Sequence, residues 1–213
     1  AYRRQRQMCI RDRIKRHLMK KGARAEDILV TGIPVRQQFL DADCCQKRER
    51  NRTRRVLIMG GGLGLMPDLK ELLEKLHSMQ GVESVVITGK NHKMYEEWVN
   101  RYEDVEVLGY TENISRYMRG ADLVITKAGG ITLFEILHSQ VPLFVIHPFL
   151  EQEMNNARYA AEKGFAKVIW GRREDYIQEL EKLLSDEKMM EEMTGNVRPV
   201  SYTHLTLPTI CSV

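Results

Sequence analysis

The sequence predicts an α/β fold of the doubly wound, Rossmann-like class, built on a parallel sheet of about six strands. Two observations support this prediction. Six short apolar segments rich in valine and isoleucine recur from Arg55 onward, and amphipathic segments with helical spacing separate most of them. Continuous apolar strands that alternate with helices are typical of a parallel sheet covered on both faces.

The predicted elements follow one another in a regular order. The six strands are RVLIMG, SVVITG, VEVLGY, LVITK, PLFVIH and AKVIW. Between the first two, the stretch 69–79 places four leucines on one face of a helix. The stretches 93–102 and 176–184 repeat this pattern, so we expect a helix in each.

The chain before Arg55 has a different character. Residues 14–21 predict a short basic helix, residues 28–31 predict a short strand, and residues 46–55 form a charged connector. We therefore expect 14–54 to be the end of a preceding domain with its connector, and 55–193 to be a C-terminal ligand-binding domain. A basic stretch this short usually marks a solvated linker and not a nucleic-acid site.

The two ends of the chain are predicted to be foreign to the domain. Residues 3–12 read RRQRQMCIRD and residues 200–209 read VSYTHLTLPT. One choice of DNA codons for the first segment gives the second as its reverse complement at all ten positions. The ends thus resemble a translated sequencing adapter, and we leave 1–13 and 199–213 out of the fold reasoning. The insert between them is expected to be a fragment of a longer enzyme.

The net charge changes once the ends are set aside. Residues 1–13 carry five arginines and one aspartate, which accounts for the whole formal charge of +4, and residues 199–213 carry no Lys, Arg, Asp or Glu. Residues 14–198 are therefore neutral overall, and we expect no nucleic-acid partner. Cys44 and Cys45 have neither disulfide nor metal-ligand spacing, so we predict no metal site and expect a reducing compartment.

The ligand site is expected in the loops after the strands, because doubly wound sheets bind ligands beyond the carboxyl ends of their strands. The fourth such loop, TKAGGIT (126–132), opens a helix with two glycines. Gly129 and Gly130 leave backbone N–H groups uncovered at the positive end of the helix, and Thr132 adds a hydroxyl. This pattern predicts a cradle for a diphosphate.

Glu135 lies about one turn further along the same helix. Its carboxylate would repel a phosphate at close range but suits a pair of neighbouring hydroxyls, such as those of a ribose. Together the cradle and the carboxylate indicate a nucleoside diphosphate. The alternative is an ordinary Gly-Gly turn with Glu135 on the surface, and this loop alone does not decide between them.

Two other loops bear on the ligand. The fifth loop, HPFLEQEMNN (147–156), gathers amides and carboxylates near a helix start, where they suit sugar hydroxyls; helix capping explains only some of them. The first loop, MGGGLGLMP (59–67), allows a ligand to approach the backbone closely. It has neither the GxGxxG pattern of dinucleotide sites nor the Gly-Lys-Ser/Thr of a Walker loop, so NAD binding is not predicted.

These motifs, in this order, resemble the C-terminal, donor-binding half of a GT-B glycosyltransferase of the family 28 type. The resemblance is closest to the processive diacylglycerol glucosyltransferases and the monogalactosyldiacylglycerol synthases, and more distant to the peptidoglycan N-acetylglucosaminyltransferase. It extends from about Val30 to about Met193. The matching segments are VTGIPVR (30–36), MGGGLG (59–64), ITGKN (87–91), VLGYTENI (107–114), TKAGGITLFE (126–135) and PFLEQEMNNA (148–157).

The resemblance implies a part for each motif in binding a UDP-sugar, which is a substrate, so no cofactor is implied. Residues 129–132 would hold the diphosphate, Glu135 the ribose, Gln152 and Glu153 the hexose, and Tyr110 with Thr111 the uracil. The implied donor-binding residues are Arg36, Gly62, Leu63, Gly64, Tyr110, Thr111, Lys127, Gly129, Gly130, Ile131, Thr132, Glu135, Gln152, Glu153 and Asn156.

Two positions depart from the family pattern. Leu150-Glu151 stands where Pro-Gly is usual before Gln-Glu, and Ala128 stands where proline is frequent. Both departures leave the implied sites in place but bear on the implied hexose contacts, so the identity of the hexose stays open.

The implied reaction is the transfer of a hexose from UDP-sugar to a lipid hydroxyl of the diacylglycerol type, with inversion. A base takes the acceptor proton, and the helix end with Lys90 or Lys127 stabilises the departing UDP without a metal. The resemblance places the base in the absent N-terminal half, so no catalytic base is assigned, and His147 is given a structural part. We expect the fragment to bind UDP-sugar without turnover, and the full-length protein to be cytoplasmic with peripheral contact to the membrane.

Two alternatives stay open at this point. A UDP-sugar 2-epimerase shares the two-domain fold, but it would need acid/base carboxylates and a histidine in the interdomain cleft. A non-catalytic α/β module that binds a nucleotide or a partner would not need Glu135 for UDP binding.

Overall fold

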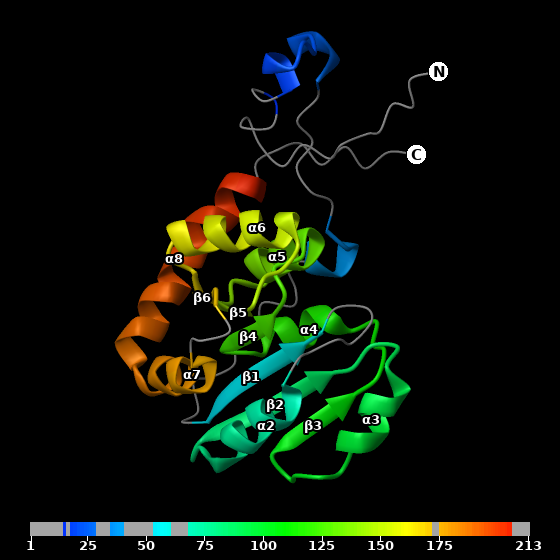
Figure 1. Cartoon of the computed structure of the whole chain (residues 1–213), viewed down its shortest axis with the longest axis vertical. Helices are drawn as coiled ribbons and strands as arrows, with labels where there is room; N and C mark the ends of the chain where they lie inside the picture. The colour runs from blue at the N-terminus through cyan, green and yellow to red at the C-terminus, as the bar shows by residue number, and fades with distance from the viewer. Residues whose placement is uncertain are drawn as a thin grey trace.

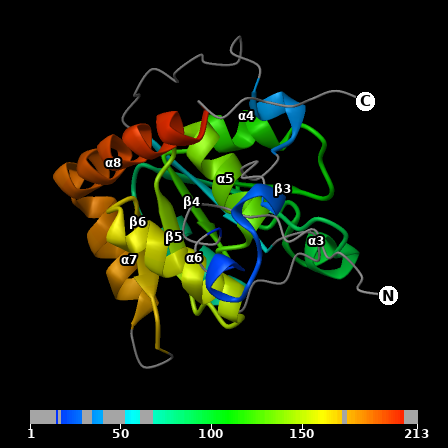
Figure 2. The ribbon, with the colours of Figure 1, turned by 90° about the horizontal axis from the view of Figure 1, so that it is seen from above.

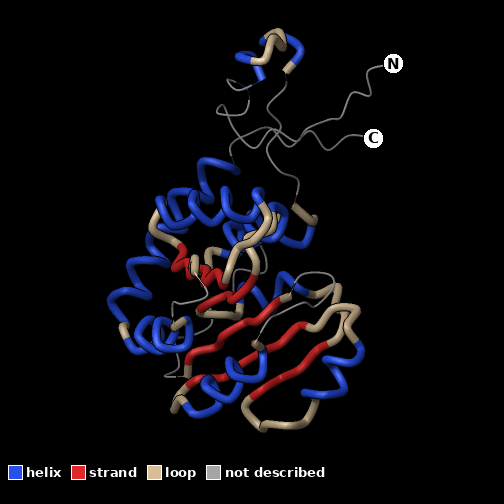
Figure 3. Tube along the Cα trace, in the orientation of Figure 1, coloured by secondary structure: helices blue, strands red, loops and turns tan. Residues whose placement is uncertain are grey.

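The structure is a computed structural model, and it describes residues 15, 18–28, 35–40, 53–60, 68–171 and 175–205, with side chains as far as Val197. Its centre is a six-stranded parallel sheet, drawn in red in Figure 3. The predicted fold class and all six predicted strands are confirmed. The strands are β1 (Arg54–Met59), β2 (Val82–Ile87), β3 (Val105–Leu108), β4 (Leu123–Thr126), β5 (Leu143–Ile146) and β6 (Ala166–Ile169).

The strand order is β3-β2-β1-β4-β5-β6, so the chain starts in the middle of the sheet and winds outward in both directions. Every neighbouring pair is parallel; Leu57 pairs with Val85 on one side and with Val124 on the other. Parallel neighbours require crossover connections, and helices supply them here. The direction of winding reverses between β1 and β4, which is where doubly wound sheets bind their ligands.

Helices cover both faces of the sheet (Figure 1). One apolar cluster joins alternate strand residues to α2 (Leu69–Ser78), α3 (His92–Trp98) and α7 (Tyr176–Ser185). The other joins the remaining strand residues to α4 (Ile114–Arg119), α5 (Gly130–Ser139) and α6 (Glu151–Glu162). Because both faces are buried, the inner strands β4 and β5 are buried throughout and almost wholly apolar. The edge strand β3 instead alternates, with Glu106 exposed between two buried valines.

The last helix, α8 (Glu187–Leu205), serves both clusters. Met190 and Met193 belong to the α2/α3/α7 cluster, whereas Val197 belongs to the other. Figure 2 shows α8 running along the domain from α7 toward α5. The helix therefore closes the end of the sheet where β6 is the edge strand.

The predicted helices are present with small shifts at their ends. The stripe of four leucines on α2 is buried as expected, and α7 extends one residue beyond its predicted end. Helix α3 is shorter than predicted and ends at Trp98, since Val99 has a non-helical ψ of 131° and Asn100 has a left-handed φ of 59°. Asparagine tolerates that conformation better than most residues do.

The segment before β1 is described only in part. Lys15 and residues 18–20 have helical backbone, whereas residues 29–34 and 41–52, which include most of the predicted strand and the connector, lie outside the described residues. A short 3₁₀ helix, Gln37–Phe39, packs on α5, and Phe39 enters the α5 cluster. Arg119 of α4 fixes this segment, because its Nη2 donates to the Phe39 carbonyl at 2.8 Å.

Among the described residues, no helix is both long and apolar enough to cross a lipid bilayer.

Candidate nucleotide-binding site

The carboxyl ends of β4 and β5 place the fourth and fifth loops next to each other, because the two strands are paired. Helix α5 begins directly after the fourth loop and α6 directly after the fifth, so both helix starts face the same edge of the sheet. The positive ends of two helix dipoles are thus directed toward one region.

The start of α5 offers three backbone donors. Gly129 is the N-cap residue and makes no side-chain capping bond, and the first intrahelical bond runs from Leu133 N–H to the Gly129 carbonyl at 2.9 Å. In the described part of the chain, no hydrogen bond uses the N–H groups of Gly130, Ile131 or Thr132. Unpaired N–H donors at the start of a helix are suited to binding an anion.

Gly129 itself differs from the expectation. Its N–H donates to the Lys127 carbonyl at 2.8 Å, so this donor is already used. Its contribution is its missing side chain. A Cβ added at Gly129 would lie 3.9 Å from the Thr132 hydroxyl oxygen. Without that Cβ, the space beside the hydroxyl stays open to a ligand.

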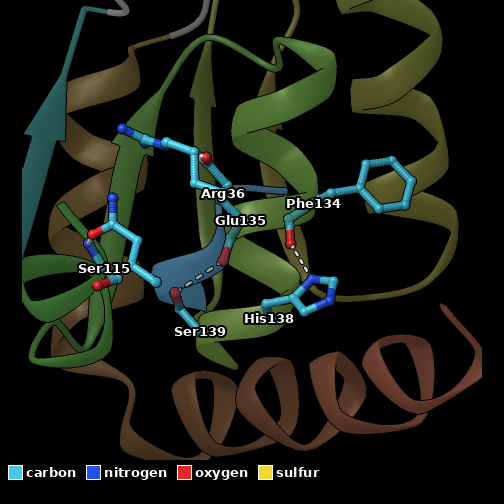
Figure 4. A network of polar contacts seen from close by, with 7 residues as sticks. Arg36, Ser115, Phe134, Glu135, His138 and Ser139 are labelled. Carbon is cyan, nitrogen blue, oxygen red and sulfur yellow. Dashed lines mark hydrogen bonds and ion pairs between the residues drawn. The ribbon is translucent and has the colours of Figure 1, made fainter. Parts of the chain in front are cut away.

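Glu135 is buried and not on the surface. It is 1% exposed, within a helix of which seven of ten residues are buried. Arg36 donates to both of its carboxylate oxygens, from Nε to Oε1 at 2.7 Å and from Nη2 to Oε2 at 2.9 Å. Figure 4 shows Arg36 and Glu135 together beside α5. The alternative in which Glu135 lies on the surface is therefore wrong.

The ion pair changes the acid–base behaviour of Arg36. The hydrogen bonds to Glu135 raise the pKa of the Arg36 guanidinium above its ordinary value, and partial burial opposes this shift. The guanidinium also lies 5.5 Å from the centre of the Phe39 ring. Because Phe39 is anchored in the core, the position of Arg36 is set by packing as well as by charge.

Asn156 connects the two loops. It is buried, and its Nδ2 donates to the Ala128 carbonyl at 2.8 Å. This bond satisfies the carbonyl just before the Gly-Gly pair and fixes α6 to the fourth loop. The structure thus gives Asn156 a contact with protein backbone, whereas the sequence predicts a contact with the donor.

Gln152 and Glu153 lie at the start of α6. Gln152 is exposed. Oε2 of Glu153 accepts from the N–H groups of Phe149 and Leu150, at 3.2 Å and 3.3 Å, which is the carboxylate half of a capping box. Helix capping therefore explains the glutamate of the Gln-Glu pair, and the predicted hexose contacts stay predictions.

An open pocket of about 470 Å³ lies beside Arg36. Tyr110, 67% exposed, also lines it, so two residues that the sequence assigned to the nucleotide line one hollow. The Thr111 hydroxyl accepts from Asn113 N–H at 3.1 Å and shapes the turn there. The sequence did not predict the other lining residues, which are Gln38, Glu112 and Asn113. Glu112 and Asn113 do lie in the segment VLGYTENI, which resembles the family.

Other features of the site are more limited. Lys127 is partly exposed, while Gly62, Leu63 and Gly64 lie outside the described residues. A second hollow of about 420 Å³, lined by Arg55, Glu83 and Asp104 among others, lies where β2 and β3 begin, at the edge opposite the helix starts. No group of three or more His, Cys, Asp and Glu side chains in the described ranges is arranged to hold a metal ion.

His147 follows β5 with a left-handed φ of 47°, which is strained for a residue other than glycine. Its ring meets the Tyr176 ring edge-on, with centroids 6.2 Å apart, and its buried Nδ1 has no hydrogen-bond partner among the described residues. Burial, and then the nearby Glu71 carboxylate, raise the pKa of Tyr176 above its ordinary value, which keeps its hydroxyl a donor to Glu71 at 3.2 Å.

The fold defines a Rossmann-like α/β domain, and the free amides at the start of α5 give it a candidate anion site. The sequence profile of the glycosyltransferase family 28 C-terminal domain matches residues 55–199. The chain therefore belongs to this family, as the motifs predicted.

Curated relatives and solved structures agree with this membership. The processive diacylglycerol beta-glucosyltransferase of Bacillus licheniformis is 35% identical over 200 residues, which cover 88% of this chain and 51% of the relative. The chain thus spans about half the length of the curated relatives that it matches.

The structural neighbours share the fold. The spinosyn rhamnosyltransferase SpnG has a TM-score of 0.63 at 19% identity, covering 79% of this chain and 45% of that one. A Listeria monocytogenes protein described as a UDP-N-acetylglucosamine 2-epimerase has a TM-score of 0.66 at 18% identity, covering 91% and 55%. The fold alone therefore does not separate a transferase from an epimerase.

Proposed function

We propose that this chain is the donor-binding half of an inverting glycosyltransferase, which transfers a hexose from a UDP-sugar to a lipid hydroxyl of the diacylglycerol type. The observation that carries the proposal is the start of α5, where three free N–H groups precede a buried carboxylate on the same helix. Family membership and the Bacillus relatives support the reaction type and the lipid acceptor.

Each part of the donor has a partner of suitable chemistry. The N–H groups of residues 130–132 would bind the diphosphate, and Glu135 would accept hydrogen bonds from the ribose. Tyr110, exposed at the rim of the open pocket beside Arg36, would line the uracil. The hexose would lie toward Gln152 at the start of α6.

In the proposed reaction, the acceptor hydroxyl oxygen attacks the anomeric carbon from the face opposite UDP. The bond from that carbon to the β-phosphate oxygen breaks, and the acceptor proton passes to a base. This half contributes by stabilising the charge that develops on the departing UDP, through the α5 amides and the helix dipole. We assign the base and most acceptor contacts to the other half of the full-length enzyme, which would contact the membrane peripherally.

The test has two arms. Calorimetry should detect UDP binding by the present chain, and Glu135→Ala should weaken that binding by about 10-fold or more, because a hydrogen bond to a charged group is lost. Absence of UDP binding would contradict the proposal, whereas full affinity in Glu135→Ala would favour a non-catalytic module.

The second arm uses the full-length gene product. It is assayed for hexose transfer to diacylglycerol and, in parallel, for epimerisation of free UDP-sugar. Transfer without epimerisation is expected; epimerisation alone would favour the 2-epimerase that shares this fold.

A further inference from the structure

Glu135 is an unusual residue for a core helix. Its neighbours Phe134, Ile136 and Leu137 are all buried, and its own side chain is 2% exposed. A buried carboxylate is costly unless it is paired, and Arg36 pairs with both of its oxygens. In the nucleotide-free protein, the acceptor proposed for the ribose is therefore already occupied.

The pair is asymmetric toward solvent. The Arg36 side chain is 45% exposed, whereas that of Glu135 is 2% exposed, and Arg36 lines the open pocket while Glu135 does not. A ligand that enters from this pocket meets the guanidinium first. It reaches the carboxylate only after Arg36 moves.

The Arg36 guanidinium thus has two possible anionic partners: the Glu135 carboxylate and an anion bound at the start of α5. Glu135 lies five residues after Gly130, about 7.5 Å along the helix axis, so the anion site at the start of α5 is within the range of a long arginine side chain. Arginine binds phosphate and carboxylate alike through its planar fork of donors. The backbone of Arg36 is held in place independently, because Phe39 is buried and its carbonyl is bound by Arg119.

We infer that Arg36 is a positioning residue that exchanges partners: it covers Glu135 in the free protein and transfers to the diphosphate when the nucleotide binds, which releases the carboxylate for the ribose. This inference rests on the proposed function. It couples the two halves of the nucleotide, since the ribose is bound only when a phosphate has drawn Arg36 away.

Inorganic pyrophosphate is the probe that separates the steps, because it has no ribose. With Glu135→Gln, Arg36 loses its competing partner, so pyrophosphate should bind about 10-fold tighter than to the wild-type chain. The same substitution removes the charged acceptor of two ribose hydroxyls, each hydrogen bond being worth about 10-fold or more in affinity. This loss exceeds the gain from Arg36, so UDP should still bind more weakly. One substitution therefore has opposite effects on the two ligands.

A double-mutant cycle distinguishes this exchange from simple charge repulsion. If Glu135 acts through Arg36, the gain in pyrophosphate affinity disappears when Glu135→Gln is made in an Arg36→Gln background. If the carboxylate only repels the anion, the gain persists there. Arg116→Gln is the matched control: it also removes one arginine charge, from an exposed position on α4 that does not line the pocket, and it should leave both ligand preferences unchanged.

The wild-type chain gives a second readout that does not depend on the folding of any variant. The Arg36 Nε–H resonance should be protected from solvent exchange in the free protein and should change when pyrophosphate is added. Unchanged or weaker pyrophosphate binding in Glu135→Gln, a gain that persists without Arg36, or an unaltered resonance would each overturn the inference while UDP binding stands. Absence of UDP binding by the wild-type chain would instead overturn the proposed function, and the inference with it.

Discussion

A substitution at Gly129 is expected to weaken UDP binding without changing the stability of the fold. Its φ of −63° is ordinary, and an added Cβ would make only a van der Waals contact with Thr132. The weaker cap of Gly129→Ala is roughly offset by the lower entropy of its unfolded chain, each effect being about 0.5–1 kcal/mol. The melting temperature should therefore hardly change, whereas UDP affinity should fall about 10-fold because the methyl group hinders the phosphate.

Gly164→Ala is the matched control for that substitution. Gly164 has a φ of 72°, and its Cβ would lie 2.7 Å from Nδ2 of Asn196. A left-handed alanine costs about 1–2 kcal/mol, so this variant should melt at a lower temperature and keep its UDP affinity. Equal UDP affinities for Gly129→Ala and the wild type would place the diphosphate away from α5.

Asn156 and Asn155 give a second matched pair. Asn156→Ala leaves the Ala128 carbonyl buried without its donor, which costs about 1–3 kcal/mol, so the melting temperature should fall by roughly 2–10 °C. Asn155 is exposed, and within the described ranges its side chain has one hydrogen bond, which Oδ1 accepts from Arg158 of the same helix at 3.3 Å, so Asn155→Ala should be close to neutral in thermal melting. Similar melting temperatures for the two variants would contradict this account of the loop connection.

Single-residue roles were predictable from the sequence only where the backbone decides them. The free amides at the start of α5 follow from a Gly-Gly pair after a strand, and they are present. The partner of Glu135 lies 99 residues earlier in the chain, and no local pattern indicates that pairing. Likewise, Asn156 fits both a sugar contact and a backbone contact, and only the tertiary packing of α6 on the fourth loop distinguishes them.

At the scale of whole elements, prediction succeeded because hydrophobic periodicity is a local signal. The strands are mostly apolar since both faces of the sheet are covered, and the leucine stripe of α2 matches its buried face. Helix ends were less predictable. The end of α3 depends on the backbone angles of Val99 and Asn100, and in that stretch apolar spacing continues beyond the last helical residue.

The contact between β6 and α7 should depend on pH. Glu179 of α7 lies 2.5 Å from Lys167 Nζ of β6, and hydrogen bonds from Lys167 and then Lys182 lower the pKa of Glu179 from 4.5 to about 2. A carboxylate whose pKa is lowered on folding stabilises the fold above pH 4.5 and loses this effect as the pH falls toward 2. The melting temperature of the wild type should therefore exceed that of Glu179→Gln at pH 6, and the difference should vanish near pH 2.

Salt and a control substitution complete that experiment. Because Glu179 is accessible to solvent, added salt should reduce the difference at pH 6. Glu162→Gln, at the exposed end of α6, should show no comparable change between pH 6 and pH 2. A difference for Glu179→Gln that stays constant across this range would show that the ion pair does not contribute to stability.

At the scale of the whole molecule, topology brings the site together. Loops that are far apart in sequence meet because β1, β4 and β5 are adjacent in the sheet, although β2 and β3 intervene between β1 and β4 along the chain. The 35–40 segment then adds Arg36 from outside the sheet. The predicted fold class is confirmed, whereas the edge expected to bind the ligand stays a prediction. The docking of the 35–40 segment on α4 and α5 was not predicted, because it depends on long-range contacts such as Arg119 with Phe39.

The predicted boundaries of the native insert lead to a final test by truncation. Val197 is the last residue whose side chain is described, and it is buried, so a chain of residues 14–198 keeps every described core residue. Its melting temperature should lie within about 2 °C of that of the full chain.

A chain of residues 55–198 matches the family domain but lacks Phe39 and Arg36. It loses about 1.5–3 kcal/mol of apolar burial and leaves Glu135 buried without its partner, at a cost of about 3–5 kcal/mol. Differential scanning fluorimetry should show a fall of more than roughly 10 °C or no folded state for the shorter chain, and Glu135→Gln should recover part of that loss by removing the unpaired charge. Equal melting temperatures for the two truncated chains would mean that the 35–40 segment does not stabilise the domain.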